Sequence, residues 1–292
     1  MIISIGIASA GRQGPLLNLL NYLSSVNLDY RKIIICTPLH SSDLPHLNDK
    51  NVLILKSPFS GLCYQRNIIL SALKEEDFVL FLDDDFLPRK DYIKNLTCFL
   101  KKRKEDVALV TGNVVADGVT KGGFSFEAGV GFLNNSFLNQ YDSCFFQVFN
   151  AYGCNMAVNM KMVREHNLKF DESLPLYGWL EDIEFSLQIK SYGKILKVSN
   201  LIGVHLGAKE GRQSASRLGY SQVINPFYIA AKHNLSARIL LKLLGFRIFK
   251  NIFYGIFFNN EIRRKRAKGN LLAFFHVIQG KIFPQRILDL KA

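Results

Sequence analysis

The chain has 292 residues, of which 48% are hydrophobic and 21% charged. This composition excludes intrinsic disorder, a collagen-like chain and a short disulfide scaffold. The net charge of +13 is unevenly spread: residues 238–292 contain 12 basic and 2 acidic side chains, a balance of +10, whereas residues 1–237 carry only +3. We therefore expect an anionic partner, and for the tail a phospholipid surface rather than nucleic acid.

The cysteines and the apolar segments indicate where in the cell the protein resides. The five cysteines form no CxxC pair and are odd in number, which favours a reducing compartment over a disulfide framework. The sequence begins Met1-Ile-Ile-Ser-Ile-Gly-Ile7, with no basic region before the apolar residues, and so indicates no signal peptide. The longest apolar segment, residues 235–258, is interrupted by four basic residues, which makes crossing a bilayer costly. We expect a cytoplasmic protein, peripheral on the inner face of the cell membrane.

Short apolar runs alternate with helical patterns through the first 112 residues, as is typical of buried parallel strands joined by helices. The apolar runs are Ile2–Ala8, Lys32–Cys36, Val52–Leu55, Phe78–Leu82 and Ala108–Thr111. The helical patterns are Pro15–Ser25, Leu62–Leu73 and Asp91–Lys102. This order predicts an α/β protein with a mostly parallel sheet flanked by helices. Ligands of such sheets bind at the carboxyl ends of the strands.

The second half of the chain is less regular. Residues 113–150 are rich in glycine and predict a long structured loop or hairpin that faces the substrate. Beyond them the pattern predicts helices at Ala157–His166 and from Glu181 to Tyr192, followed by a strand at Ile195–Val198.

Three acidic residues, Asp83, Asp84 and Asp85, directly follow the predicted strand Phe78–Leu82. Adjacent carboxylates repel one another unless a cation is present, and carboxylates at a strand end can hold Mg²⁺ or Mn²⁺ together with substrate phosphates. A solvated acidic turn is the alternative. The apolar strand before the cluster favours the metal and phosphate site.

A second set of candidates lies between residues 179 and 205. Glu181 and Asp182 open a predicted helix, a place where acidic side chains often only stabilise the helix terminus. Trp179, just before them, offers an aromatic platform suited to a sugar ring, which favours a position beside a ligand. His205 lies between two glycines, in a loop predicted after the strand Ile195–Val198. A lone histidine is more often structural, but His205 is the best candidate for a nitrogen ligand to the cation.

Two basic residues have settings from which they could reach a diphosphate. Arg66 opens the predicted helix Leu62–Leu73 and could bind a phosphate or the acidic cluster, because guanidinium groups pair with both bidentately. An ordinary surface arginine is the alternative. The turn Ala8-Ser-Ala10-Gly-Arg12 after the first strand could admit a nucleotide, although it is neither a GxGxxG motif nor a P-loop.

Five stretches together resemble the inverting family 2 glycosyltransferases with the GT-A fold. They are Ile2–Arg12, Gly61–Asn67 in place of the family's GxxxARN, Leu82–Asp85 with Pro88 in place of its DxD segment, Gly153–Asn155 and Trp179–Asp182. The stretches follow the family order with suitable spacing, and the resemblance covers about residues 1–207.

The resemblance implies roles for the acidic residues and the histidine. Asp83 and Asp85 would bind the metal and the diphosphate, with His205 as a third metal ligand. Asp84 would lie close to the nucleotide. Asp182 would be the general base that takes the proton of the acceptor.

The remaining matched residues would bind the two substrates. On the donor side they are Ala8, Ala10, Arg12 and Arg66. On the acceptor side they are Trp179 and Glu181.

The chain departs from the family after the second predicted strand. Members usually carry an acidic residue there that reads the nucleobase, whereas this chain continues Cys36-Thr-Pro-Leu-His-Ser-Ser-Asp43. Asp43 would substitute for that residue from a longer loop, and a UDP-sugar is the donor that we expect. The helix after Asp182 also has Gln188 and Lys190 where many members carry an arginine.

The resemblance thus implies metal-dependent transfer of a sugar, with inversion, from a nucleoside diphosphate sugar to an acceptor hydroxyl. Residues 1–207 would form the catalytic domain, with a donor half at 1–112 and an acceptor and base half at 113–207. Residues 208–292 would form a basic helical tail, divided at Gly245, whose amphipathic stretch Arg247–Phe258 binds an anionic membrane or packs on the protein. We expect a glycan or lipid-linked glycan acceptor in the assembly of a bacterial surface polysaccharide, and the sequence leaves a homo-oligomer open.

Two other functions fit part of the sequence. A sugar-nucleotide pyrophosphorylase also uses carboxylate-bound metal, and the turn Ala8–Arg12 resembles its glycine-rich loop. That class requires a second Gly-x-Arg segment close by, which this loop lacks, and has no role for Trp179–Asp182.

The other alternative is a non-enzymatic membrane or nucleic-acid-binding protein in which the acidic residues are structural. Thermal stabilisation by a nucleoside diphosphate with Mn²⁺ would separate it from both enzymes.

Overall fold

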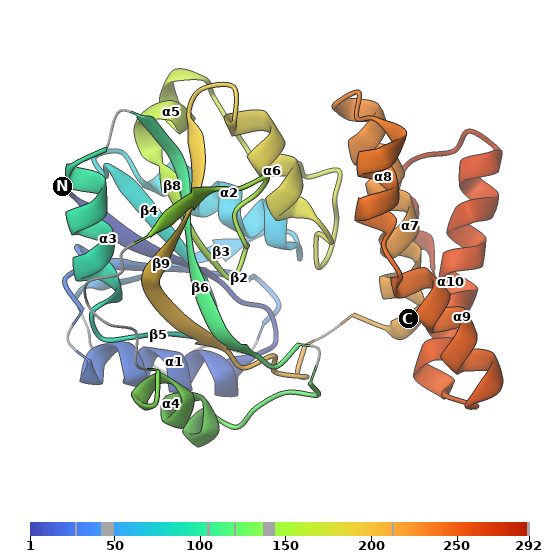
Figure 1. Cartoon of the computed structure of the whole chain (residues 1–292), viewed down its shortest axis with the longest axis horizontal. Coiled ribbons are helices and arrows are strands. Elements are labelled where there is room, and N and C mark those ends of the chain that lie inside the picture. Colours follow the sequence, from blue (N-terminus) through green and yellow to red (C-terminus); the bar gives the residue numbers. More distant parts are fainter. Residues whose placement is uncertain are drawn as a thin grey trace. The chain divides into compact units, whose positions relative to one another are not determined.

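The computed structural model describes residues 1–26, 28–41, 50–103, 106–119, 121–136, 144–211 and 213–290. The chain divides into two compact units (Figure 1). The first contains Met1–Ser60, Tyr64–Phe170 and Phe185–Gly211. The second contains Gly61–Cys63, Asp171–Glu184 and Arg212–Ala292.

The first unit is built on one mixed sheet. Its strands are β1 (Ile3–Ala8), β2 (Ile33–Pro38), β3 (Val52–Ser57), β4 (Phe78–Asp83), β5 (Phe86–Pro88), β6 (Val107–Asp117), β7 (Phe145–Gln147), β8 (Asn155–Asn159) and β9 (Lys194–His205). The order is β3-β2-β1-β4-β8-β6-β9-β5, and β7 pairs with β9. The first four strands are parallel, as are β6 and β9, whereas β8 is antiparallel to both its neighbours. The predicted α/β class is confirmed.

Helices cover both faces of this sheet (Figure 1). They are α1 (Gln13–Ser25), α2 (Leu62–Ala72), α3 (Tyr92–Lys101), α4 (Phe126–Asn134), α5 (Met160–Glu165) and α6 (Glu181–Ile189). Apolar side chains of α1, α3 and α4 share one core with the isoleucines of β1. On the opposite face Gly6 of β1 lies against Ile69 of α2 and Phe81, so closely that an added Cβ would lie 3.0 Å from both. Strands buried on both faces explain why β1, β2 and β4 are nearly continuous apolar runs.

The predicted helix at Ala157–His166 is wrong in its first part. Residues 155–159 form β8, which fills the gap between β4 and β6, and the helix begins only at Met160. Asn159 ends the strand and caps the helix, because its side chain accepts hydrogen bonds from the N–H groups of Lys161 and Met162. Tertiary pairing overrides the local helical pattern here.

Two other expectations also differ from the structure. Residues 113–150 are not simply a loop or hairpin, because they include the end of β6, the helix α4 and the strand β7. The strand predicted at Ile195–Val198 extends from Lys194 to His205. His205 is therefore the last residue of a strand and not part of a loop. The length of β9 follows from its three partners, β5, β6 and β7, which pair with successive parts of it.

The second unit is helical in its C-terminal part. Its helices are α7 (Ala215–Lys232), α8 (Ala237–Leu244), α9 (Arg247–Phe257), α10 (Glu261–Ile278) and a 3-10 helix at Pro284–Asp289. The predicted break at Gly245 is confirmed, because Gly245 ends α8 with a φ of 58°. No helix in the described part of the chain is long and apolar enough to cross a membrane.

Two glycines let α7 and α10 cross in close contact. An added Cβ on Gly219 would collide with the carbonyl oxygen of Arg266, and one on Gly269 would collide with that of Ser216. The Gly269 position would also lie 2.8 Å from the backbone nitrogen of Tyr220. Backbone atoms cannot move aside as a flexible side chain can, so these helices tolerate no larger residue at the crossing.

This crossing predicts opposite effects for two Gly→Ala substitutions. Gly269→Ala should destabilise the second unit by about 1–3 kcal/mol through overpacking. Gly131→Ala in α4, where an added Cβ meets nothing within 4 Å, should stabilise the first unit by about 0.5–1 kcal/mol through helix propensity. Chemical denaturation followed by circular dichroism measures both. Equal changes in the two variants would contradict the close crossing.

Candidate active site

The acidic residues lie where two parallel strands end. Asp83 is the last residue of β4, and the register of β1 and β4 places Ala8 opposite it. Asp84 and Asp85 form the turn from β4 into β5. The apolar sequence of β4 holds the strand in the core and thereby fixes this turn at the carboxyl edge of the sheet.

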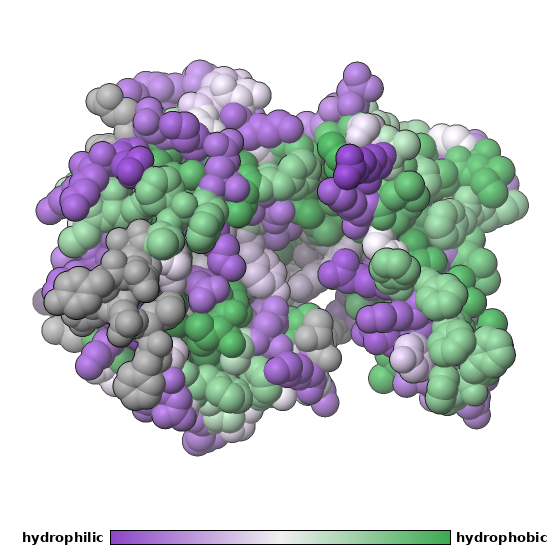
Figure 2. All heavy atoms as spheres, in the orientation of Figure 1, coloured by the Kyte–Doolittle hydropathy of each residue, from purple (hydrophilic) through white to green (hydrophobic). Residues whose placement is uncertain are grey.

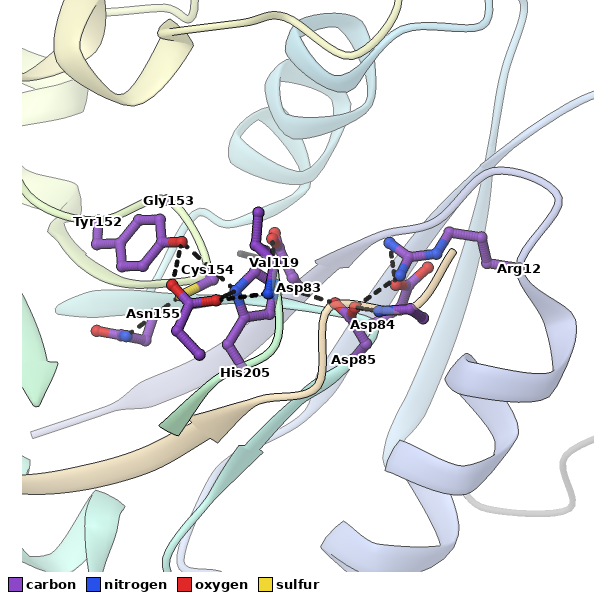
Figure 3. Close-up of polar contacts among 12 residues, drawn as sticks. Arg12, Asp83, Asp84, Asp85, Val119, Tyr152, Gly153, Cys154, Asn155 and His205 are labelled. Carbon is purple, nitrogen blue, oxygen red and sulfur yellow. Dashed lines mark hydrogen bonds and ion pairs between the residues drawn. The ribbon is translucent and has the colours of Figure 1, made fainter. Parts of the chain in front are cut away.

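His205 reaches this edge because of the pairing of β9. It lies opposite Phe86 of β5 and opposite Asp117 of β6. Its Nε2 is 3.4 Å from Oδ1 of Asp85 and 3.8 Å from Oδ2 of Asp83. One ligand atom from each of the three residues lies within 4.8 Å of the others. In Figure 3, His205 and Arg12 approach Asp85 from opposite sides.

The geometry and chemistry of this group suit a divalent cation. Oδ2 of Asp85 accepts hydrogen bonds of 2.7 Å from Arg12 and from the N–H of Ala208, so the carboxylate is held with Oδ1 toward His205. Two carboxylate oxygens and one imidazole nitrogen form a donor set suited to Mn²⁺, and to Mg²⁺ when further oxygens come from substrate phosphates. Asp83, Asp85 and His205 could therefore hold the cation that the sequence predicts.

Asp117 is a member of the site that the sequence did not reveal. Its Oδ1 lies 3.3 Å from Nδ1 of His205, and its Oδ2 accepts a 3.0 Å hydrogen bond from the hydroxyl of Tyr152. A carboxylate that accepts the Nδ1 proton fixes the ring and leaves Nε2 for a metal. Asp117 comes at the end of a strand predicted to stop at Thr111, so no local signal marked it.

The electrostatics of the cluster follow from its burial. Burial raises the pKa of Asp84 to about 7, although the charge of Arg12 opposes the shift. Burial would also raise the pKa of Asp85, but contact with His205, the charge of Arg12 and the Ala208 N–H lower it well below its usual range. Burial would lower the pKa of His205, but contacts with Asp117 and Asp85 raise it to about 10. The positive charge of the protonated His205 ring thus offsets the negative charge of the carboxylates, at the place where a metal cation would bind.

Arg12 joins the first strand to the acidic turn. Its guanidinium lies 2.8 Å from Oδ1 of Asp84 and 2.7 Å from Oδ2 of Asp85. Asp84 also accepts a 2.6 Å hydrogen bond from the hydroxyl of Ser9. Asp84 is therefore turned toward the end of β1 and not toward His205. A pocket opens at this end of the sheet and is lined by Ser9, Gly11, Arg12, Gln13, Leu16, Thr37 and Ser41.

The predicted donor residues fall on or beside this pocket. Ala8 ends β1 and lies opposite Asp83, and Ala10 is in the turn before Arg12. The ends of β1 and β2 are fixed by Gln65, whose amide donates to the carbonyls of Ser9 and Cys36 at 2.9 and 2.6 Å. The predictions did not assign Gln65 a role, although it stands in the recognised stretch Gly61–Asn67. Asp43, the predicted nucleobase contact, lies outside the described residues.

Arg66 is buried beneath the acidic turn. Its guanidinium donates a 2.9 Å hydrogen bond to the carbonyl of Gly153 and lies 3.4 Å from Oδ1 of Asp83. The rings of Phe81 and Phe170 flank it, each with its centroid at 5.3 Å. Of the two roles predicted for Arg66, this position corresponds to holding the acidic cluster.

The predicted base and acceptor residues belong to the second unit. Trp179, Glu181 and Asp182 stand at the start of α6, and the backbone before it is unusual. Leu176, Gly178 and Leu180 all have positive φ, of 59°, 60° and 70°. Two leucines in a conformation that favours glycine indicate strain, and such strain is concentrated at functional sites.

Helix α7 holds this strained segment in place. The Asn225 side chain donates a 2.8 Å hydrogen bond to the carbonyl of Trp179. Lys232 lies 2.6 Å from Asp171 and 2.7 Å from the fully buried Glu184, and His233 lies 2.9 Å from Glu184. The tail helices therefore form one body with the segment that carries Asp182.

Comparison with known proteins shows which family the middle of the chain resembles. Residues 36–166 match the model of glycosyl transferase family 2. No match to a curated protein sequence reaches significance.

Solved structures of S. aureus TarS share the fold. Its residues 1–349 in complex with UDP-GlcNAc superpose with a TM-score of 0.55 at 15% identity, covering 98% of this chain and 83% of TarS 1–349. The complex of the same fragment with UDP gives a TM-score of 0.52 at 15% identity, with 96% and 92% covered. A longer TarS structure gives 0.52 at 16% identity, and the match there covers 88% of this chain but only 44% of TarS.

The family match, the mixed sheet with helices on both faces and the acidic turn at the end of β4 agree with one another. Residues 36–166 are thus similar to glycosyl transferase family 2, and the chain has the GT-A fold.

Proposed function

We propose that the protein transfers a sugar, with inversion and with the help of Mn²⁺ or Mg²⁺, from a UDP-sugar to a hydroxyl of a glycan acceptor. The observation that carries the proposal is the cluster of Asp83, Asp85 and His205, whose ligand atoms lie within 4.8 Å of one another at the carboxyl edge of the sheet.

The donor would bind at the ends of β1 and β4. The residues around Arg12 and Thr37 would contact the nucleoside, as the resemblance implies for this region. The hydroxyl of Thr37 is buried and has no hydrogen-bond partner among the described residues, so it would be available to a ligand. The uridine nucleotide is proposed because the structural neighbour TarS has been solved with UDP-GlcNAc and with UDP.

The three cluster residues would hold the cation, which when bound would neutralise the departing diphosphate. Arg66 would keep Asp83 in place, and Arg12 and the Ala208 N–H would do the same for Asp85. These contacts would hold the ligands in place before the reaction, which is what electrostatic stabilisation of a transition state requires.

Asp182 would act as the base. As the acceptor oxygen attacks the anomeric carbon, the bond from that carbon to the diphosphate oxygen breaks, and Asp182 takes the acceptor proton. Attack opposite to the leaving group inverts the anomeric configuration. Trp179 and Glu181 would bind the acceptor. The strained backbone of residues 176–180 supports a functional role for this segment.

The acceptor is proposed to be a glycan or lipid-linked glycan in bacterial surface polysaccharide assembly, reached from the cytoplasmic face of the membrane. Support comes from the basic composition of residues 238–292, which suits an anionic surface.

A screen of nucleotide sugars tests the function as a whole. A UDP-sugar should raise the melting temperature only with Mn²⁺ or Mg²⁺ and should be hydrolysed slowly without acceptor. Stabilisation by a nucleoside triphosphate alone would favour nucleotidyl transfer.

Substitution of Asp85 tests the metal site. Asp85→Asn keeps the size of the side chain but removes its charge, so Mn²⁺-dependent UDP affinity should fall by about 100-fold or more. Isothermal titration measures the affinity. Asp106→Asn, on an exposed carboxylate at the edge of β6, is the matched control and should bind normally. Wild-type affinity in Asp85→Asn would remove Asp85 from the site.

Asp117 should act through His205. Asp117→Asn should lower Mn²⁺ affinity by about 10–100-fold, because the ring loses its charged acceptor at Nδ1. Tyr152→Phe removes only the hydroxyl that donates to Asp117 and should have a much smaller effect. Electron paramagnetic resonance of free Mn²⁺ gives the affinities. If Asp117→Asn bound Mn²⁺ as tightly as the wild-type protein does, Asp117 would have no part in holding the histidine.

Asp182→Asn tests the base. The variant retains a side chain that can accept the 2.9 Å hydrogen bond from the Ile183 N–H, but it cannot take a proton. Turnover should fall by about 10²-fold or more while UDP binding is retained. Glu181→Gln is the control and should retain more activity. A loss confined to Glu181→Gln would transfer the role of base to that residue.

A further inference from the structure

Helix α9 packs on the other helices of its unit through the side that carries Asn251 and Gly255. Asn251 is fully buried, and its amide donates to Gln222 of α7 at 2.8 Å and to Asn270 of α10 at 3.0 Å. Arg263 donates to the same Asn251 side chain at 2.9 Å. One turn later Gly255 lies against the backbone of Arg264. Side chains four residues apart share a face, so Asn251 and Gly255 define the inner face of the helix.

The outer face of α9 is apolar. Phe246, just before the helix, is 81% exposed, Phe249 is 63% exposed and Phe257 is 71% exposed. Phe253 completes the spacing of three and four residues, and its ring lies 5.8 Å from that of Phe249 and 5.0 Å from that of Phe257. These four residues form what we call the phenylalanine stripe. Figure 2 shows hydrophobic side chains gathered over the part of the molecule where Figure 1 places α9.

Exposed basic side chains lie on α9 and on neighbouring helices of its unit. Lys250 lies one residue from Phe249 and is exposed, as are Lys242 on α8 and Arg264 and Lys268 on α10. Glu261 and Asp289 are the only acidic residues between positions 238 and 292. A second copy of this chain docked through the stripe would bring two surfaces of like charge together, which electrostatic repulsion opposes. An anionic surface that accepts apolar side chains fits both properties.

We propose that the phenylalanine stripe and the exposed basic residues of its unit dock the protein on an anionic lipid bilayer. The phenyl rings enter the boundary between headgroups and acyl chains, and the lysines and arginines contact lipid phosphates. The buried Asn251 network holds α9 on the other helices of its unit, so the helix need not leave them to expose its rings.

The same unit carries the segment assigned to the acceptor. The guanidinium of Arg247, the first residue of α9, lies 5.2 Å from the ring centroid of Trp179, and α7 holds the Trp179 carbonyl through Asn225. Docking through α9 therefore brings Trp179 and Asp182 to the membrane as one body. With the proposed function, on which this step rests, the acceptor is a lipid-linked glycan that the enzyme meets at the bilayer.

Vesicle co-sedimentation tests the docking. The intact protein should sediment with vesicles that contain phosphatidylglycerol, should not sediment with pure phosphatidylcholine, and should be released by salt because the attraction is screened. The double variant Phe249→Ser/Phe257→Ser should lower partition by about tenfold or more through lost apolar burial. Lys242→Gln/Lys250→Gln should weaken binding and reduce its dependence on salt.

Phe146→Ser is the matched control, because Phe146 is 60% exposed but lies on β7 in the first unit. It should sediment like the wild type. Equal sedimentation of the wild type and the double phenylalanine variant would overturn the proposal. Failure of the intact wild-type protein to sediment with anionic vesicles would also overturn it. That holds even if the stripe is then found to join two copies of the chain in solution.

Mn²⁺-dependent UDP binding is measured on the same samples. It should be unchanged in all these variants, and an unchanged circular dichroism spectrum should show that the helices of the second unit are folded. Loss of vesicle binding with UDP binding retained is thus a result about the stripe alone. Absence of UDP binding in the wild type would instead contradict the proposed function and leave the docking result valid.

Discussion

The pairing of β9 with β5 and β6 is the constraint on which the candidate site depends. It places His205 opposite Phe86 and Asp117, and so beside a turn whose carboxylates come from β4. Without this pairing the three acidic residues would be an acidic turn with no nitrogen ligand. The buried Arg66 then pairs with Asp83, and Arg12 pairs with Asp85. These contacts hold the carboxylates in place before any ligand binds, which would lower the cost of reorganisation in the proposed reaction.

How much the sequence predicts depends on the range of the interactions involved. The acidic turn and the strand before it are neighbours in the chain, so an apolar run that ends in Asp83-Asp84-Asp85 is enough to predict them. Asp117 could not be predicted in this way, because its role comes from a strand pairing with His205, 88 positions along the chain. The same applies to β8, whose residues have a helical pattern but fill a gap in the sheet. His205 was identified from its flanking glycines, although its strand was predicted too short.

The tail shows a limit of amphipathic patterns. The sequence separates polar from apolar residues on α9, but it does not say which side faces the protein. Inside a helical unit the apolar side is normally buried. Here Asn251 is buried because Gln222, Asn270 and Arg263 satisfy its hydrogen bonds, and the phenylalanines are left outside. Only the packing of α7, α9 and α10 shows that the phenylalanines are on the exposed side.

The most direct test of the central claim is anomalous scattering at the manganese edge from crystals grown with Mn²⁺ and UDP. The account predicts a peak within coordination distance of Oδ2 of Asp83, Oδ1 of Asp85 and Nε2 of His205. Bound UDP with no peak at these three atoms, or with manganese held elsewhere, would contradict it.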